Sequence, residues 1–110
     1  MGSADRKITY TLVTSFCDDQ LKEGWYRFKG GAGTKMPTTQ VEMNRCGTAF
    51  PGWLNGNHPT VADGEVVRKV CFHQCDDNSL IIKVKNCASY FIYRLVPTSC
   101  NRRYCGTDLP

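Results

Sequence analysis

The stretch LIIKVKNCASYFIYRLV (residues 80–96) decides the fold class of this chain. Between residues 80 and 85, apolar side chains alternate with mostly charged ones, the period of two expected for a strand with one buried face. Residues 90–96 are aromatic and β-branched almost throughout, which also favours a strand. Because only residues 86–89 separate the two segments, the stretch predicts an antiparallel hairpin at the centre of a sheet.

Short strand-like segments also precede the hairpin, and clusters of glycine, proline and asparagine separate them. Residues 8–14, 25–28 and 65–72 favour extended structure, and the glycine-rich residues 30–33 are typical of a turn. Only residues 18–23 suggest a single helical turn. We therefore predict a small disulfide-rich, mainly β domain: an antiparallel sheet with irregular loops and at most one or two short helices.

The 110 residues are long enough for one domain with a modest core. Met1-Gly2-Ser3 has the composition of a cloning remnant, so residues 4–110 are expected to form the single domain. Large aromatic residues supply much of the burial in a core this small, so Trp25 and Trp53 are expected to have structural roles before any binding role.

Seven cysteines in so short a chain indicate an oxidising, extracellular environment, where disulfide bonds stabilise domains with small cores. The number is odd. At most three bridges can form within one chain, and one sulfur is left as a thiol or as an interchain bond.

The alternative use of clustered cysteines is metal binding, and Cys71, His73 and Cys75 offer three ligands on one face of a strand, with Cys87 or Asp76 as a fourth. Structural zinc sites usually bring two pairs of ligands from separate places, and no second pair of ligands, such as a Cys-x-x-Cys sequence, follows here. A small Cys71–Cys75 disulfide loop is the alternative interpretation, and we expect no metal and no cofactor.

The formal net charge is +4, but the basic residues are spread along the chain. The basic residues are too scattered to form the dense basic patch of a nucleic-acid-binding surface. Arg94, Arg102 and Arg103 are the candidate binding surface, suited to an acidic glycan or protein. No apolar run approaches the ~20 residues that a membrane-spanning helix needs.

Catalysis has little support in the sequence. The chain has two histidines, His58 and His73, and none of the common hydrolase, metalloprotease or nucleotide-binding motifs. Cys87 could act as a nucleophile with either histidine as the base, but nothing in the sequence places them together. We therefore expect a protein that is not an enzyme.

Six fragments in one order carry a resemblance to a known family: GWYRF (24–28), RCGT (45–48), PGWLNG with HP (51–56 and 58–59), GEVVRKVCFH (64–73), VKNC (84–87) and RYC (103–105). Together they resemble the cysteine-rich domain of uromodulin and the related pancreatic zymogen-granule glycoprotein. The resemblance implies a noncatalytic extracellular binding or scaffold module, either secreted or the extracellular part of a larger protein. Its partner would be an extracellular protein or glycan; the family's partners include bacterial fimbrial adhesins.

The resemblance also implies a disulfide pattern: Cys17 with Cys100, Cys46 with Cys105, and Cys71 with Cys75. Cys87 would then be an unpaired thiol, which leaves a monomer, or a dimer if Cys87 bonds to a second chain. Two family cysteines that bond to each other are replaced here, one by Gln40 and the other by Asp76, so that a whole bridge is missing.

The chain departs from glycan-presenting members of the family because no asparagine lies in an Asn-x-Ser/Thr sequence. This copy cannot act as an N-glycan decoy. Two interpretations from other classes remain open at this point. One is a small secreted effector, such as a toxin or enzyme inhibitor, and the other is the metal-binding protein built on Cys71, His73 and Cys75.

Overall fold

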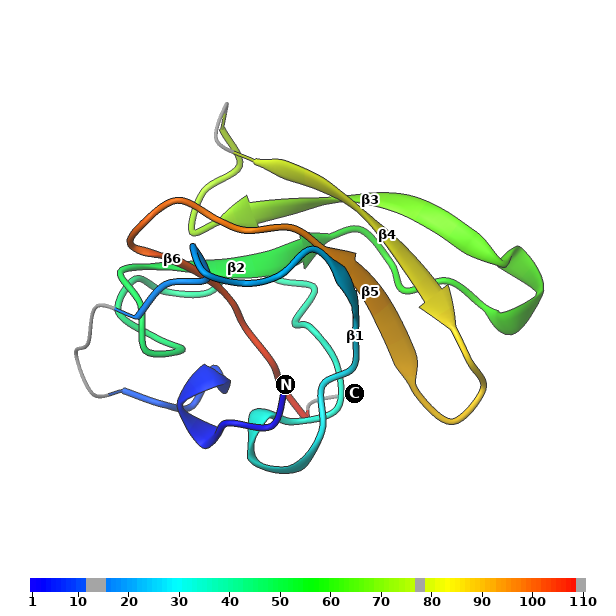
Figure 1. Cartoon of the computed structure of the whole chain (residues 1–110), viewed down its shortest axis with the longest axis horizontal. Helices are drawn as coiled ribbons and strands as arrows, with labels where there is room; N and C mark the ends of the chain where they lie inside the picture. The colour runs from blue at the N-terminus through cyan, green and yellow to red at the C-terminus, as the bar shows by residue number, and fades with distance from the viewer. Residues whose placement is uncertain (12–15, 77–78, 109–110) are drawn as a thin grey trace.

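The computed structural model describes residues 1–11, 16–76 and 79–108 of the chain. Their strands are β1 (Gly24–Tyr26), β2 (Phe50–Asn55), β3 (Glu65–Phe72), β4 (Leu80–Asn86), β5 (Phe91–Leu95) and β6 (Arg102–Tyr104). They form one six-stranded sheet in the order β1-β5-β4-β3-β2-β6 (Figure 1).

Helical structure in the described residues is limited to three short 3-10 turns: η1 (Ala4–Arg6), η2 (Gly30–Ala32) and η3 (Val61–Asp63). None of the described helices is long and apolar enough to cross a membrane. The predicted fold class, mainly β with little helix, is confirmed.

The predicted hairpin is formed by β4 and β5, which pair antiparallel with Val84 opposite Tyr93. Strand β4 also pairs antiparallel with β3, which places the hairpin inside the sheet. The prediction of a wholly antiparallel sheet is corrected at one edge, where β6 pairs parallel with β2. The chain crosses from β5 to the far edge of the sheet before β6, and such a crossover can deliver a strand parallel to its neighbour.

Alternation along the strands separates the two faces of the sheet. On the inner face, Val70, Val84 and Tyr93 are fully buried, and Phe28, Ala32 and Met36 cover them from the loop segments. The Phe28 and Tyr93 rings meet edge to face with centroids 5.5 Å apart. These contacts make the main core.

The two tryptophans differ in their environment. Trp53 is half-buried, donates its indole N–H to the His73 carbonyl at 3.0 Å, and packs on a second apolar cluster. Trp25 keeps 38% of its surface exposed. The expectation that Trp25 has a structural role before any binding role rests on burial, and burial does not support it, because its position opposite Arg94 turns the ring to the outer face of the sheet.

Two segment predictions are also corrected. Within the expected strand over residues 8–14, the described part forms a turn in which Tyr10 donates its N–H to the Lys7 carbonyl, and residues 12–14 lie outside the described residues. Over residues 18–23, where a single helical turn is expected, the structure has a hydrogen-bonded turn from the Leu21 N–H to the Asp18 carbonyl and no helix.

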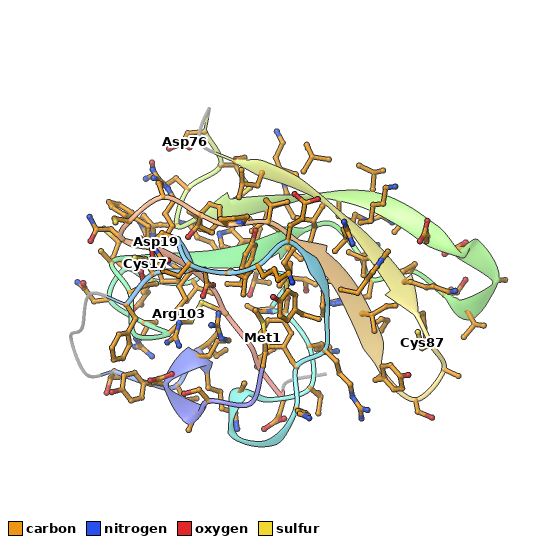
Figure 2. The ribbon with its side chains drawn as sticks, viewed as in Figure 1. Met1, Cys17, Asp19, Asp76, Cys87 and Arg103 are labelled. Atoms are coloured by element: carbon orange, nitrogen blue, oxygen red, sulfur yellow. A yellow bond between two sulfur atoms is a disulfide. The ribbon has the colours of Figure 1, made fainter. Side chains whose placement is uncertain are left out.

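The first residues of the chain pack on the rest of the domain. Met1 contacts the main core, and its carbonyl accepts the N–H of Lys29 at 3.1 Å (Figure 2). The assignment of Met1-Gly2-Ser3 to a cloning remnant stays a prediction, and these contacts show that the segment has a place on the folded surface.

A buried ion pair joins the start of the chain to the last strand. Arg6 donates two hydrogen bonds to the Asp18 carboxylate, at 2.7 and 2.8 Å, and both side chains are more than nine-tenths buried. The same carboxylate accepts the N–H of Tyr104 at 2.9 Å, and Arg6 donates to the Tyr104 carbonyl at 2.9 Å. The charges are thus paired and hydrogen-bonded on several sides, as burial of an ion pair requires.

His58 is held neutral against the other side of the core. The Tyr93 hydroxyl accepts the Met36 N–H at 2.9 Å, which leaves its own proton to donate to Nε2 of His58 at 2.7 Å. Burial, aided by the positive charges of Lys35 and Arg68, lowers the pKa of His58 from 6.5 to about 4. Protonation would also turn Nε2 from an acceptor into a donor.

Removal of the Asp18 carboxylate is predicted to destabilise the domain strongly. Asp18→Ala leaves Arg6 buried without its partner and should lower the free energy of unfolding by about 3–5 kcal/mol. Asp19→Ala, a change at the exposed neighbouring carboxylate, is the matched control and should shift it by about 0.5 kcal/mol or less. Urea unfolding of both variants measures the difference, and equal losses would contradict the role given to Asp18.

Acid is predicted to destabilise the domain through His58. The unfolded state binds a proton at His58 below about pH 6.5, and the folded state does so only below about pH 4. The stability that comes from the neutral, hydrogen-bonded His58 ring is therefore fully present above pH 6.5 and is lost as the pH falls towards 4. After allowance for partial exposure, the loss is on the order of 1 kcal/mol. The difference in unfolding free energy between the wild type and His58→Gln should narrow over this range. A constant difference would show that His58 does not titrate as described.

Candidate functional site

Two disulfide bonds lie within the described residues. Cys46 and Cys105, both fully buried, join the loop before β2 to the residue that follows β6, with Cα atoms 5.6 Å apart. Cys71 and Cys75 close a small loop at the end of β3, with Cα atoms 4.7 Å apart. Both bonds have the pairing that the family resemblance implies.

The metal site considered for Cys71, His73 and Cys75 is not formed in this structure. The two sulfurs are bonded to each other, and an oxidised pair offers no thiolate to a metal. Nδ1 of His73 lies 3.0 Å from the carbonyl oxygen of Val41, so the ring makes a structural hydrogen bond to the neighbouring loop.

A second group of sulfur and oxygen ligands lies at the surface near the Arg6–Asp18 pair. The possible ligand atoms of Cys17, Asp19 and Cys100 are all within 4.8 Å of one another. The Cys17 thiol donates to Asp19 at 3.2 Å, and the Cys100 thiol lies 3.8 Å from the other carboxylate oxygen (Figure 2 labels Cys17 and Asp19). Hydrogen bonding with Cys17, followed by the nearby negative charges, raises the pKa of the Cys100 thiol.

This arrangement supports two kinds of chemistry. The sulfurs are close enough for a disulfide after a small side-chain movement, and if both stay reduced they could hold a thiophilic metal with Asp19 as a third ligand. Asp19 was not predicted as a neighbour of these cysteines, although its place two residues after Cys17 was a signal for it. The Cys17–Cys100 bridge stays a prediction.

Cys87 is a free thiol at the end of β4, far from this group (Figure 2). It is half-buried, and its N–H donates to the Tyr90 carbonyl at 2.8 Å, which closes the β4–β5 hairpin. A dimer joined through the partly exposed Cys87 thiol stays a prediction.

The three arginines of the candidate surface do not come together. Arg94 lies on β5 with its side chain 40% exposed and an ion pair to Glu23 at 3.2 Å. Arg102 lies on β6, at the other side of the sheet, where it donates to Ser99 and covers the Phe50 and Phe72 rings.

Arg103 is buried and has a structural role. Its guanidinium donates to Asp5 at 3.0 Å and to the Cys46 carbonyl at 3.2 Å, and burial lowers its pKa (Figure 2). Arg103 is therefore less accessible to a partner than Arg94 and Arg102, and a binding role for these arginines stays a prediction.

Disulfide mapping tests the remaining bridge. Peptide mapping without reduction should recover Cys17–Cys100 together with the two bridges above, because sulfurs this close form a bond under oxidising conditions. Elemental analysis of the oxidised protein should then find no bound zinc. A one-to-one zinc species that survives dialysis, or a bridge from Cys87 to another cysteine of the same chain, would contradict this assignment.

Comparisons with known proteins identify the family to which the chain belongs. The family model of the uromodulin-like domain matches residues 26–106. The chain is 48% identical over 96% of its length to the pancreatic secretory granule membrane major glycoprotein GP2 of Canis lupus familiaris, and 47% identical over 81% of its length to uromodulin of Mus musculus. It spans only 21% and 14%, respectively, of these relatives. The chain belongs to the family of uromodulin-like domains.

Proposed function

We propose that this chain is a noncatalytic extracellular binding or scaffold module of the uromodulin type. The observation that carries the proposal is the family match over residues 26–106, which covers five of the six strands and part of β1. One relative is by name a secretory granule membrane glycoprotein, which supports a secretory route for this chain. Cys46–Cys105 and Cys71–Cys75 also suit an oxidising compartment.

The positions of the histidines support a noncatalytic role. His58 accepts a hydrogen bond from Tyr93 and has a pKa of about 4, so at neutral pH it is a neutral part of the core. His73 is engaged with the Val41 carbonyl. Neither ring hydrogen-bonds to a cysteine within the described residues, so no activated thiol of the Cys–His kind supports catalysis.

The mode of contact follows from the sequence and the surface together. Because the chain has no site for N-glycosylation, it would meet a partner through protein surface and not through an N-glycan of its own. The domain of residues 4–110 would present this surface as a monomer unless Cys87 joins two copies. The whole sheet is held as one unit by its pairing and by Cys46–Cys105, which suits a pre-formed binding surface.

A secretion and binding experiment tests the proposal. The chain is produced behind a secretory leader in mammalian cells, biotinylated at an added tag, and applied to intact epithelial cells and extracellular matrix. We expect secretion of the oxidised protein, and saturable binding that unlabelled chain displaces. Reduced and alkylated chain, which loses its bridges, is the control and should not compete. Retention inside the cell, or equal competition by the alkylated chain, would contradict a secreted, folded binding module.

A further inference from the structure

One row of side chains runs across four strands on the outer face of the sheet. Trp25 pairs with Arg94, Arg94 with Lys83, and Lys83 with Val67, so these residues of β1, β5, β4 and β3 lie side by side. Directly opposite residues in neighbouring strands point to the same face. The chain neighbours of Lys83 and Arg94, Val84 and Tyr93, are fully buried in the core, which turns this row to solvent.

The outer face is covered at one end and open at the other. Over β2, Trp53 packs on Val41, Cys46 and Cys105, so the disulfide-linked loop closes that part. Over β3 and β4, Val67 and Ile81 are 58% and 61% exposed. A depression of about 380 Å³ lies between them, bordered also by Glu23, Lys83 and Arg94. Aliphatic side chains this exposed beside one another mark a surface suited to a partner.

The open face carries an excess of positive charge. This face of β3, β4 and β5 carries four cations, namely Lys69, Lys83, Lys85 and Arg94. Lys69 lies opposite Ile81, and Lys83 lies opposite Val67 on one side and Arg94 on the other. Arg94 is paired with Glu23, and Lys85 lies opposite Glu65 across the strands. Lys69 and Lys83 form no ion pair with any residue that the structure describes. Two lysines beside Val67 and Ile81 therefore complement a partner with both negative charge and apolar side chains.

We propose that the open face formed by Trp25, Val67, Lys69, Ile81, Lys83 and Arg94 is a docking surface for an acidic protein segment. Carboxylates of the segment meet Lys69 and Lys83, and an apolar side chain enters the depression between Val67 and Ile81. Trp25 and Arg94, residue types that often dominate binding energy, border the contact. This proposal names the partner class for the proposed binding function and rests on it.

A protein segment fits this face better than an acidic glycan does. A sulfated or sialylated glycan would use the lysines and the Trp25 ring, but its hydroxyl groups would desolvate against Val67 and Ile81 without a hydrogen-bond partner. An amphipathic acidic segment can pair its carboxylates with the lysines and pack its apolar side chains against Val67 and Ile81.

The first test is a titration of the isotope-labelled chain with a synthetic peptide that alternates Glu or Asp with Leu or Ile. Amide shifts measured by nuclear magnetic resonance should change at Val67, Ile81, Lys83 and Arg94, together with the indole N–H of Trp25. A peptide of the same apolar residues with Lys in place of the acids should cause no such change. Raising the salt from about 50 to about 300 mM should weaken binding, because it shortens the Debye length.

Matched variants separate this face from general electrostatics. Lys83→Glu should weaken binding of the acidic peptide about fivefold, since it removes one exposed charge pair and introduces repulsion. Lys29→Glu makes the same charge change at an exposed lysine next to η2, away from the paired strands, and should stay within about twofold. Ile81→Ser keeps the charge and should also weaken binding. All three positions are exposed, and an unchanged melting temperature confirms that the variants fold.

Three results of these titrations would overturn the proposal, and a fourth comes from the cell-binding experiment. The first is an equal effect of Lys83→Glu and Lys29→Glu, and the second is the absence of shift changes on this face. The third is a sulfated oligosaccharide that binds more tightly than the peptide and is unaffected by Ile81→Ser, which would assign the face to a glycan. If cell-surface binding of the secreted chain persists unchanged in Lys83→Glu, the docking surface fails while the proposed binding function stands.

Discussion

The buried Arg6–Asp18 pair joins segments of the fold that are far apart in the chain. Asp18 receives two hydrogen bonds from Arg6 and one from the Tyr104 N–H, while its own backbone N–H donates to the Arg102 carbonyl at 3.0 Å. One residue thus connects the start of the chain to both ends of β6. Leaving a buried charge unpaired is very costly in free energy. The native state therefore requires the start of the chain and β6 to pack together around this ion pair.

The position of β6 determines where the Cys46–Cys105 bond and the second apolar cluster form. Tyr104 enters the core, which brings the following Cys105 to Cys46, and the loop tied by this bond lies against Trp53. The loop therefore covers the outer face over β2. Strands β1, β5, β4 and β3 have no such cover among the described residues, so the same sheet has one closed region and one open, basic region.

The central hairpin and the fold class could be predicted because they depend on local alternation. Residues 80–96 carry the period of two, and the register of β4 and β5 follows from burying every second side chain. The resemblance to uromodulin-type domains supplied the pairing of Cys46 with Cys105, which spacing alone leaves undetermined. Trp25 was misplaced because its aromatic character indicates burial, whereas its exposure depends on which face β1 turns towards the core. Arg103 was misplaced for the opposite reason, since its partners Asp5 and Cys46 are remote in sequence.

The sequence by itself determined the period of the strands, the turns between them, the supply of sulfur and the absence of N-glycosylation sites. Each of these depends on residue type and on near neighbours along the chain. Only the tertiary structure decided that β6 runs parallel to β2, that Asp18 is buried beside Arg6, and that Asp19 lies beside Cys17 and Cys100. It also decided which lysines share a face with Val67 and Ile81. The physical reason is that these contacts join residues far apart in the chain, where their geometry is set by the packing of the whole sheet and not by local preference.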